Sequence, residues 1–354
     1  MVTDSLAPYD AVLLLSFGGP ESQDEVVPFL RRVTAGKGIP DERLEEVGAH
    51  YRLFGGRSPI NDQNRALLAA LRTELDIRGI TTPLRWGNRH SAPFVVDALR
   101  EAEQAGEQRI LALRTSAWRS YSSCRQYRED LEQAAIDGVT VDVVRPYGEH
   151  PGFAATSAAL VRDAVAGLQE ANPDLSDLRL LYVTHSIPDP MDLTSGPPEQ
   201  ERTYSRAHLA LAEAITAEVE AELEVSLSAE LVYCSRSGPP AMPWLEPDVA
   251  EHIRTLPGDG VRRVVVAPIG FVSDHMEVVY DLDIDAAEAA DEVGIEMVRV
   301  PTVGTDARFV SGLVDLLVEH AARARGEAPP SPAWGPLTPT PSPCPTGCCP
   351  HLRR

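Results

Sequence analysis

The sequence predicts an α/β protein made of two doubly wound domains, each with a parallel β-sheet. Short apolar runs, several of them β-branched, alternate with longer amphipathic runs along most of the chain. This alternation is typical of β-α-β units, which build parallel sheets through right-handed crossovers. It runs twice, and the first pass ends near residue 150. A chain of 354 residues, 43% of them hydrophobic, is long enough to bury cores of ordinary size.

The strands and helices are predicted from these runs in chain order. Strands are expected at residues 11–17, 84–88, 109–115, 139–145, 178–185, 229–236, 261–269 and 295–300. Several of these runs are apolar throughout, which is typical of strands that helices cover on both faces. Helices are expected at residues 22–35, 60–78, 92–105, 124–135, 153–170, 202–223, 246–256, 275–292 and 305–325.

Three regions are predicted: an N-terminal domain over residues 1–150, a C-terminal domain over 151–325, and a Pro-rich tail with cysteines over 326–354. The tail begins where the composition changes to "GEAPPSPAWGPLTPTPSP", which has no helix or strand period and predicts an extended linker. Two doubly wound domains would hold a ligand in the cleft between them, at the carboxyl ends of their strands.

The charge and the N-terminal sequence argue against several classes of protein. A net charge of −21 disfavours binding to nucleic acid, which needs basic patches, and adhesion to anionic lipid. The opening "MVTDSLAPYDAVLLLSFGG" lacks the basic region and cleavage site of a secretory signal, and its apolar run is too short to span a bilayer. We therefore expect a cytoplasmic protein without an integral membrane segment.

The acidic stretch "GFVSDHMEVVYDLDID", residues 270–285, is the strongest candidate for a functional site. At about 100° per residue, Glu277, Asp281 and Asp285 line one face of a helix, and Asp274 is a candidate N-cap. One interpretation is a solvated acidic face. However, residues 270–298 contain no Lys or Arg, and the stretch follows a predicted buried strand. Carboxylates at that strand end would attract a divalent cation or accept protons.

Other candidate residues lie at the ends of other predicted strands. His185 ends the strand in "LLYVTHSIP", where it is either structural or a proton acceptor and metal ligand. The glycine pairs of "LLLSFGGPES" and "YRLFGGRSPIN", with the hydroxyls and aromatics of "TSAWRSYSSCRQY", could surround a flat anionic ligand. The spacing of these glycines does not match a dinucleotide-binding motif.

In this order, "LLLSFGGPES", "FGGRSPIN", "VTHSIP", "YCSRSGPPAMPWLEPDV" and "PIGFVSDHMEVVYDLDID" resemble the ferrochelatases, over roughly residues 9–325. The residues of these motifs are most similar to those of actinobacterial members, which insert Fe²⁺ into coproporphyrin III during haem synthesis. The resemblance implies two Rossmann-like domains, the chelatase fold, with the porphyrin clamped between them. It implies that His185 and Glu277 face each other across the macrocycle as catalytic and metal-binding residues. Asp281 and Asp285 would continue the metal path outward.

The resemblance also implies contacts with the porphyrin. Phe17 matches a family position near the macrocycle. Candidate partners of the propionates or of the ring edge, each alternatively structural or surface, are Arg31, Tyr51, Ser58 and Tyr121. Expected partners are the porphyrin, ferrous iron and, as a candidate, a downstream haem-pathway enzyme.

Five cysteines are present, and three of them, Cys344, Cys348 and Cys349, lie within the last eleven residues. In a reducing compartment this clustering favours metal over disulfides. Cluster-bearing ferrochelatases hold a [2Fe–2S] centre with three C-terminal cysteines and one from the body. The resemblance thus implies a cluster on these three and Cys124, whereas Cys234 should pack as a small apolar residue. A disordered tail with free thiols is the alternative.

Other functions stay open on the sequence. Protoporphyrin IX is the alternative porphyrin. A chelatase that inserts Co²⁺ into a sirohydrochlorin-type ring is a second enzyme, but such relatives tend to have a second His in place of Glu277. His275 lies nearby and is expected to point elsewhere. A third alternative is a binding protein that closes on a small anion without catalysing a reaction. The acidic helix disfavours this alternative.

Overall fold

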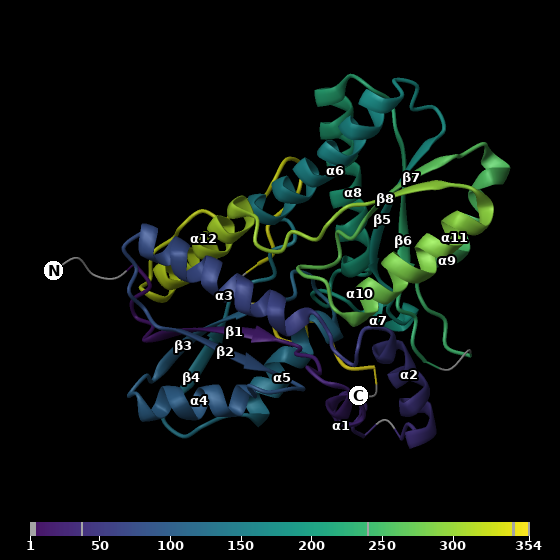
Figure 1. The fold of residues 1–354 in the computed structure, drawn as a ribbon. Coiled ribbons are helices and arrows are strands. Elements are labelled where there is room, and N and C mark those ends of the chain that lie inside the picture. The colour runs from purple at the N-terminus through teal and green to yellow at the C-terminus, as the bar shows by residue number, and fades with distance from the viewer. Residues whose placement is uncertain (1–4, 37, 239–240, 342–343, 353–354) are drawn as a thin grey trace.

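The computed structural model describes residues 5–36, 38–238, 241–341 and 344–352. It contains two four-stranded sheets, and every strand pair in them is parallel. The first sheet, with the order β2-β1-β3-β4, comprises β1 (Ala11–Ser16), β2 (Leu84–Asn88), β3 (Arg109–Arg114) and β4 (Thr140–Val143). The second, with the order β6-β5-β7-β8, comprises β5 (Leu178–His185), β6 (Ser228–Cys234), β7 (Arg263–Ala267) and β8 (Glu296–Arg299). The eight predicted strands are confirmed (Figure 1). Both sheets have the same strand order, so the prediction that the β-α-β pattern runs twice along the chain is also confirmed.

Helices cover both faces of each sheet (Figure 1). Their bounds are α1 (Gln23–Val33), α2 (Asp41–Leu53), α3 (Ile60–Ile77), α4 (Val95–Gln104), α5 (Gln126–Gln133), α6 (Pro151–Ala171), α7 (Asp189–Leu193), α8 (Thr203–Leu223), α9 (Val249–Thr255), α10 (Met276–Tyr280), α11 (Ala286–Val293) and α12 (Ala307–Ala324). Short π-helical turns, η1 (Tyr121–Arg125) and η3 (Asp281–Asp285), precede α5 and α11, and the 3₁₀ turn η2 (Leu256–Asp259) follows α9. The sequence reasoning missed α2 and α7.

The alternation of side chains along the central strands explains the doubly wound layers. Leu13 and Leu15 of β1 pack into the core beneath α4, whereas Leu14 packs into the opposite core with α3. In β5, Leu181 and Val183 likewise enter a different core from their neighbours. Successive residues of a strand point to opposite faces, so a strand that is apolar throughout needs a helix layer on each side.

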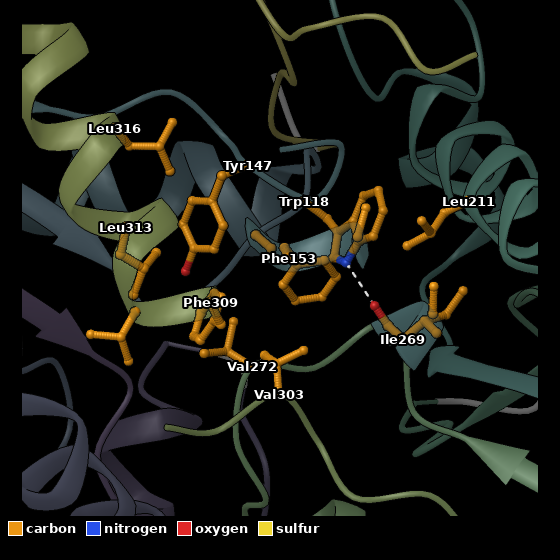
Figure 2. Close-up of a cluster of buried hydrophobic side chains, with 14 of the residues drawn as sticks. Trp118, Tyr147, Phe153, Leu211, Ile269, Val272, Val303, Phe309, Leu313 and Leu316 are labelled. Carbon is orange, nitrogen blue, oxygen red and sulfur yellow. Dashed lines mark hydrogen bonds between the residues drawn. The ribbon is translucent and has the colours of Figure 1, made fainter. Parts of the chain in front are cut away.

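The two halves share one hydrophobic core, which Trp118 helps to build. Trp118 follows β3 and is 4% exposed, and its ring packs edge-on against Phe153 of α6, which in turn packs against Phe309 of α12. Its indole N–H donates a hydrogen bond of 3.2 Å to the carbonyl oxygen of Ile269, in the loop after β7 (Figure 2). The domain boundary predicted at residue 150 falls just before α6 and stays a prediction.

The described residues of the Pro-rich tail form no helix or strand, as predicted, and the tail packs on the body of the protein. The Trp334 amide donates to the Glu149 carbonyl oxygen at 2.9 Å, and the Arg145 guanidinium bonds the Pro332 carbonyl oxygen at 3.3 Å. Farther on, the Cys349 amide donates to the carbonyl oxygen of Gly196 at 3.0 Å. Within the described ranges, no helix combines the length and the apolar composition that crossing a membrane requires.

Candidate functional site

The carboxyl ends of three neighbouring strands bring the main candidate residues together. His185 is the last residue of β5, Ser235 follows β6, and the loop after β7 leads into α10, which carries Glu277. His185 Nε2 lies 3.6 Å from Glu277 Oε2, and the Ser235 hydroxyl donates a short hydrogen bond to the Asp281 carboxylate. These side chains form one polar group at the strand ends, where α/β folds hold ligands.

The expectation that His185 and Glu277 face each other across a macrocycle is wrong. A flat ring between them would need about 3.5 Å of van der Waals contact on each face, or roughly 7 Å in total. Their side chains are 3.6 Å apart. Both groups therefore belong to one wall, and a bound ring would have to lie to one side of the pair.

The predicted helix over 275–292 contains the π turn η3 between α10 and α11. From 277 to 281 an α-helix overshoots a full turn by about 40°. A π turn takes more residues, so the step from 281 to 285 falls short of a turn instead. The π turn thus offsets the drift, which keeps Glu277, Asp281 and Asp285 in one acidic track.

Asp274 and Asp283 have a cationic partner that lies outside the acidic segment in the sequence. Arg299, the last residue of β8, pairs with Asp274 at 2.6 Å and with Asp283 at 3.2 Å. The predicted N-cap role of Asp274 is wrong, because His275 occupies the N-cap position of α10. Parallel pairing of β7 and β8 brings this arginine beside the acidic segment, so repulsion among its carboxylates is partly offset.

An aromatic wall lies next to the acidic track. Phe17, Phe29 and Tyr51 pack with Met276, the residue before Glu277. Next to this wall, His50 of α2 stacks on Tyr280 of α10, with ring centroids 4.1 Å apart. The α1–α2 segment of the first half therefore contacts the site helix of the second half (Figure 1).

The other predicted porphyrin contacts are spread out. Arg31 is exposed and pairs with Asp41 at 2.7 Å. Ser58 is 2% exposed and packs against Gly19, where a Cβ would approach its side chain to 2.7 Å. The Tyr121 ring packs edge-on against His351 of the tail. Phe17 and Tyr51 are thus the two that adjoin the acidic track through Met276, and all five roles stay predictions.

Comparison with known proteins identifies the family. The family model of the ferrochelatases matches residues 9–321. The chain belongs to the ferrochelatase family. It is 50% identical to the coproporphyrin III ferrochelatase of Streptomyces griseus, and the alignment covers 97% of this chain and 94% of that one. It is 48% identical to the enzyme of the same name from Leifsonia xyli, with 99% and 93% coverage. The solved structure of CbiX, a siroheme-synthesis enzyme of denitrifying bacteria, is similar at 16% identity and a TM-score of 0.48, over 86% of this chain and 98% of that one.

The electrostatics of this ferrochelatase site favour proton uptake near neutral pH. Burial by itself lowers the pKa of His185, but the hydrogen bond and the charge of Glu277 outweigh it, so the pKa is raised. Burial raises the pKa of Asp281 to about 7, against the hydrogen bond from Ser235. The His185 Nδ1–H donates to the Ser186 carbonyl oxygen at 2.5 Å, so Nε2 is the nitrogen that can take up a proton beside Glu277.

His275 also belongs to this group, contrary to the expectation that it points elsewhere. Its Nδ1 lies 3.8 Å from Glu277 Oε2, and burial lowers its pKa. The i,i+2 spacing suggested divergent side chains, but residue 275 precedes the first turn of α10 with an extended backbone, φ −118°. Helical spacing does not apply there.

We expect Asp281→Asn to stabilise the protein at pH 8, by on the order of 3 kcal/mol. The folded-state pKa of Asp281, about 7, lies above that of an unfolded aspartate, so wild-type stability falls as pH rises from about 4 to 7. The uncharged amide removes this loss while keeping an acceptor for Ser235. Urea unfolding at pH 5 and pH 8 measures the effect, with Glu288→Gln on the exposed face of α11 as control. Equal stability of wild type and variant at both pH values would contradict it.

The four predicted cluster cysteines come together where the tail packs on the body of the protein. The Cys344 thiol interacts with both Cys124 and Cys348, and the Cys348 and Cys349 sulfurs are 3.6 Å apart. Gly196 donates its amide to Cys349 Sγ at 3.1 Å. In the described part of the chain, no three His, Cys, Asp or Glu side chains form a ready-made metal-ligand set. Cys234 is fully buried in the core, as predicted.

Proposed function

We propose that this chain inserts Fe²⁺ into coproporphyrin III to form coproheme, in the cytoplasm and on the way to haem. The chain is 50% identical, over 97% of its length, to a coproporphyrin III ferrochelatase, and this similarity supports the proposed substrate. The contact of His185 with Glu277, beside the partly buried Asp281, supports the chemistry. A downstream haem-pathway enzyme as partner stays a prediction.

The proposed mechanism follows from the proton balance of metalation. One Fe²⁺ enters the ring and two pyrrole N–H protons leave. With the ring against the aromatic wall of Phe17, Phe29 and Tyr51, the His185 Nε2 lone pair can take a proton, and Glu277 stabilises the imidazolium that forms. Asp281 can hold a proton near neutral pH and relay it along the acidic track. The same carboxylates would attract the incoming cation.

A comparison of two porphyrins tests the proposal. Under anaerobic conditions with Fe²⁺, coproporphyrin III should lose its free-porphyrin fluorescence rapidly with this protein and only slowly without it. Protoporphyrin IX, which has two propionates, should be turned over more slowly than coproporphyrin III, which has four. Faster turnover of protoporphyrin IX would replace the proposed substrate. A shifted spectrum without loss of fluorescence would replace catalysis by simple binding.

We also propose that Cys124, Cys344, Cys348 and Cys349 hold a [2Fe–2S] cluster. Thiolates are the usual ligands of such clusters, and these four thiols lie in one chain of contacts. A buried cation also fits an anionic centre there: the Arg114 guanidinium is completely buried and interacts electrostatically with Cys124. When bound, a cluster of this type can accept and give up one electron.

Cys344→Ser is expected to abolish the visible absorption of the anaerobically purified protein, because it removes the thiol between Cys124 and Cys348. Cys234→Ser is the matched control, since Cys234 lies in the core of the second half. Iron and sulfide analysis accompanies the spectra. Unchanged absorption and iron content in Cys344→Ser would contradict the ligand assignment.

A further inference from the structure

Within the part of the chain that the structure describes, Arg114 is a buried cation without a carboxylate partner. It is the last residue of β3, and its side chain is 0% exposed. Its Nη2 donates a long hydrogen bond of 3.3 Å to the Val144 carbonyl oxygen, whereas Nε and Nη1 have no hydrogen-bond partner within the described residues. Among the residues that the structure describes, no carboxylate pairs with it.

Burying the charge of Arg114 destabilises the folded protein unless an anion lies beside it. A guanidinium keeps its charge at every physiological pH, and an uncompensated buried charge costs several kcal/mol. The groups that act on Arg114 are the thiols of Cys124 and Cys344 and the phenol of Tyr147. No carboxylate is among these groups, so in the described part of the chain no acidic side chain compensates the charge of Arg114.

We propose that Arg114 is the counter-charge of the iron–sulfur centre and raises its reduction potential. This inference rests on the cluster proposed above. Assembly of the centre releases the thiol protons, and the resulting thiolates and sulfides outweigh the iron charge, with two net negative charges when oxidised and three when reduced. A fixed buried cation favours the more negative, reduced form, because electrostatic attraction is strong where water is excluded.

A second arginine acts on the same thiols. Arg128 of α5 also acts electrostatically on Cys124 and Cys344, and none of the described residues forms a hydrogen bond with its buried Nε. It is less buried than Arg114. Removing its charge should therefore change the reduction potential in the same direction but by less.

The test compares wild type, Arg114→Met and Arg114→Lys as holoproteins, by anaerobic redox titration followed by visible absorption and electron paramagnetic resonance. Methionine keeps much of the side-chain volume and removes the charge, whereas lysine keeps the charge. We expect Arg114→Met to lower the reduced-to-oxidised ratio at a fixed potential by tenfold or more, which equals 59 mV or more for one electron. Arg114→Lys should stay near wild type. Arg109→Met, at the opposite end of β3 where Arg109 pairs with Asp142 at 3.0 Å, is the control and should not shift the potential.

The melting temperature of the apoprotein is a second readout, because Arg114→Met should stabilise the apoprotein but weaken the holoprotein. After iron is removed by a chelator under reducing conditions, Arg114→Met should melt at a higher temperature than wild type, because the uncompensated charge is gone. The holoprotein of the same variant should lose its cluster faster. A wild type that takes up no iron and sulfide would overturn the cluster and this inference together. A cluster-bearing wild type with the same potential as Arg114→Met would overturn only the role of Arg114.

Discussion

Replacing His185 with alanine is expected to reduce the rate of iron insertion by about 10²- to 10⁴-fold, the usual contribution of a positioned acid–base group. The imidazole is the basic nitrogen beside Glu277, at 3.6 Å, and Glu277 raises its pKa. Its side chain is 32% exposed, so the variant should stay folded. The initial rate of coproporphyrin III fluorescence loss measures the effect, with circular dichroism to check the fold.

Glu277→Gln and the double variant sharpen this test. If His185 and Glu277 act as one unit, the double variant should be about as slow as the slower single variant, because each replacement already disables the pair. His252→Ala is the matched control: His252 pairs with Glu230 at 2.7 Å, outside the acidic track. Retained turnover in both single variants would remove the assigned roles, and multiplicative losses would mean that the two residues act independently.

Trp118→Ala is expected to lower the free energy of unfolding by about 3–5 kcal/mol, the usual cost of emptying a buried aromatic site. The indole is 4% exposed and packs against the His208 ring, with ring centroids 3.9 Å apart and the planes tilted by 35°. It also donates to Ile269 in the other half of the molecule. The loss should therefore weaken the packing between the two halves as well as the local core.

Urea unfolding followed by far-ultraviolet circular dichroism measures this loss. Trp118→Phe keeps a ring but removes the hydrogen bond to Ile269, so it should lose less than alanine does. Trp334→Ala, in the partly buried tail, is the control and should cost less than either core change. A midpoint and slope of Trp118→Ala within error of wild type would show that the shared core does not depend on this ring.

The secondary structure was largely predictable because it depends on local periodicity. Each central strand is a run of apolar residues bounded by turn residues, and such runs are apparent in the sequence. The two missed helices have weak local signals. Only Leu44, Gly48 and Tyr51 of α2 are buried, too few for an apolar stripe, and α7 is five residues long.

The candidate site was predictable in its residues and only partly in its geometry. Strand ends and the acidic segment pointed to His185 and Glu277, but the opposed arrangement expected from the family was wrong. The contact of 3.6 Å depends on how β5 and β7 pair and on where the following loop turns. His275 was missed because helical spacing was applied to a residue outside the helix.

By itself, the sequence determined the α/β class, the twofold strand rhythm and which polar residues stand at strand ends, since these follow from spacing along the chain. Only the tertiary structure decided that His185 and Glu277 share one wall, that Arg299 offsets the charge of Asp274, and that Arg114 is buried against thiols. Each of these contacts joins residues from different elements of the fold. The charge balance of a buried site is set by what packing brings within a few ångströms, and no local pattern carries that information.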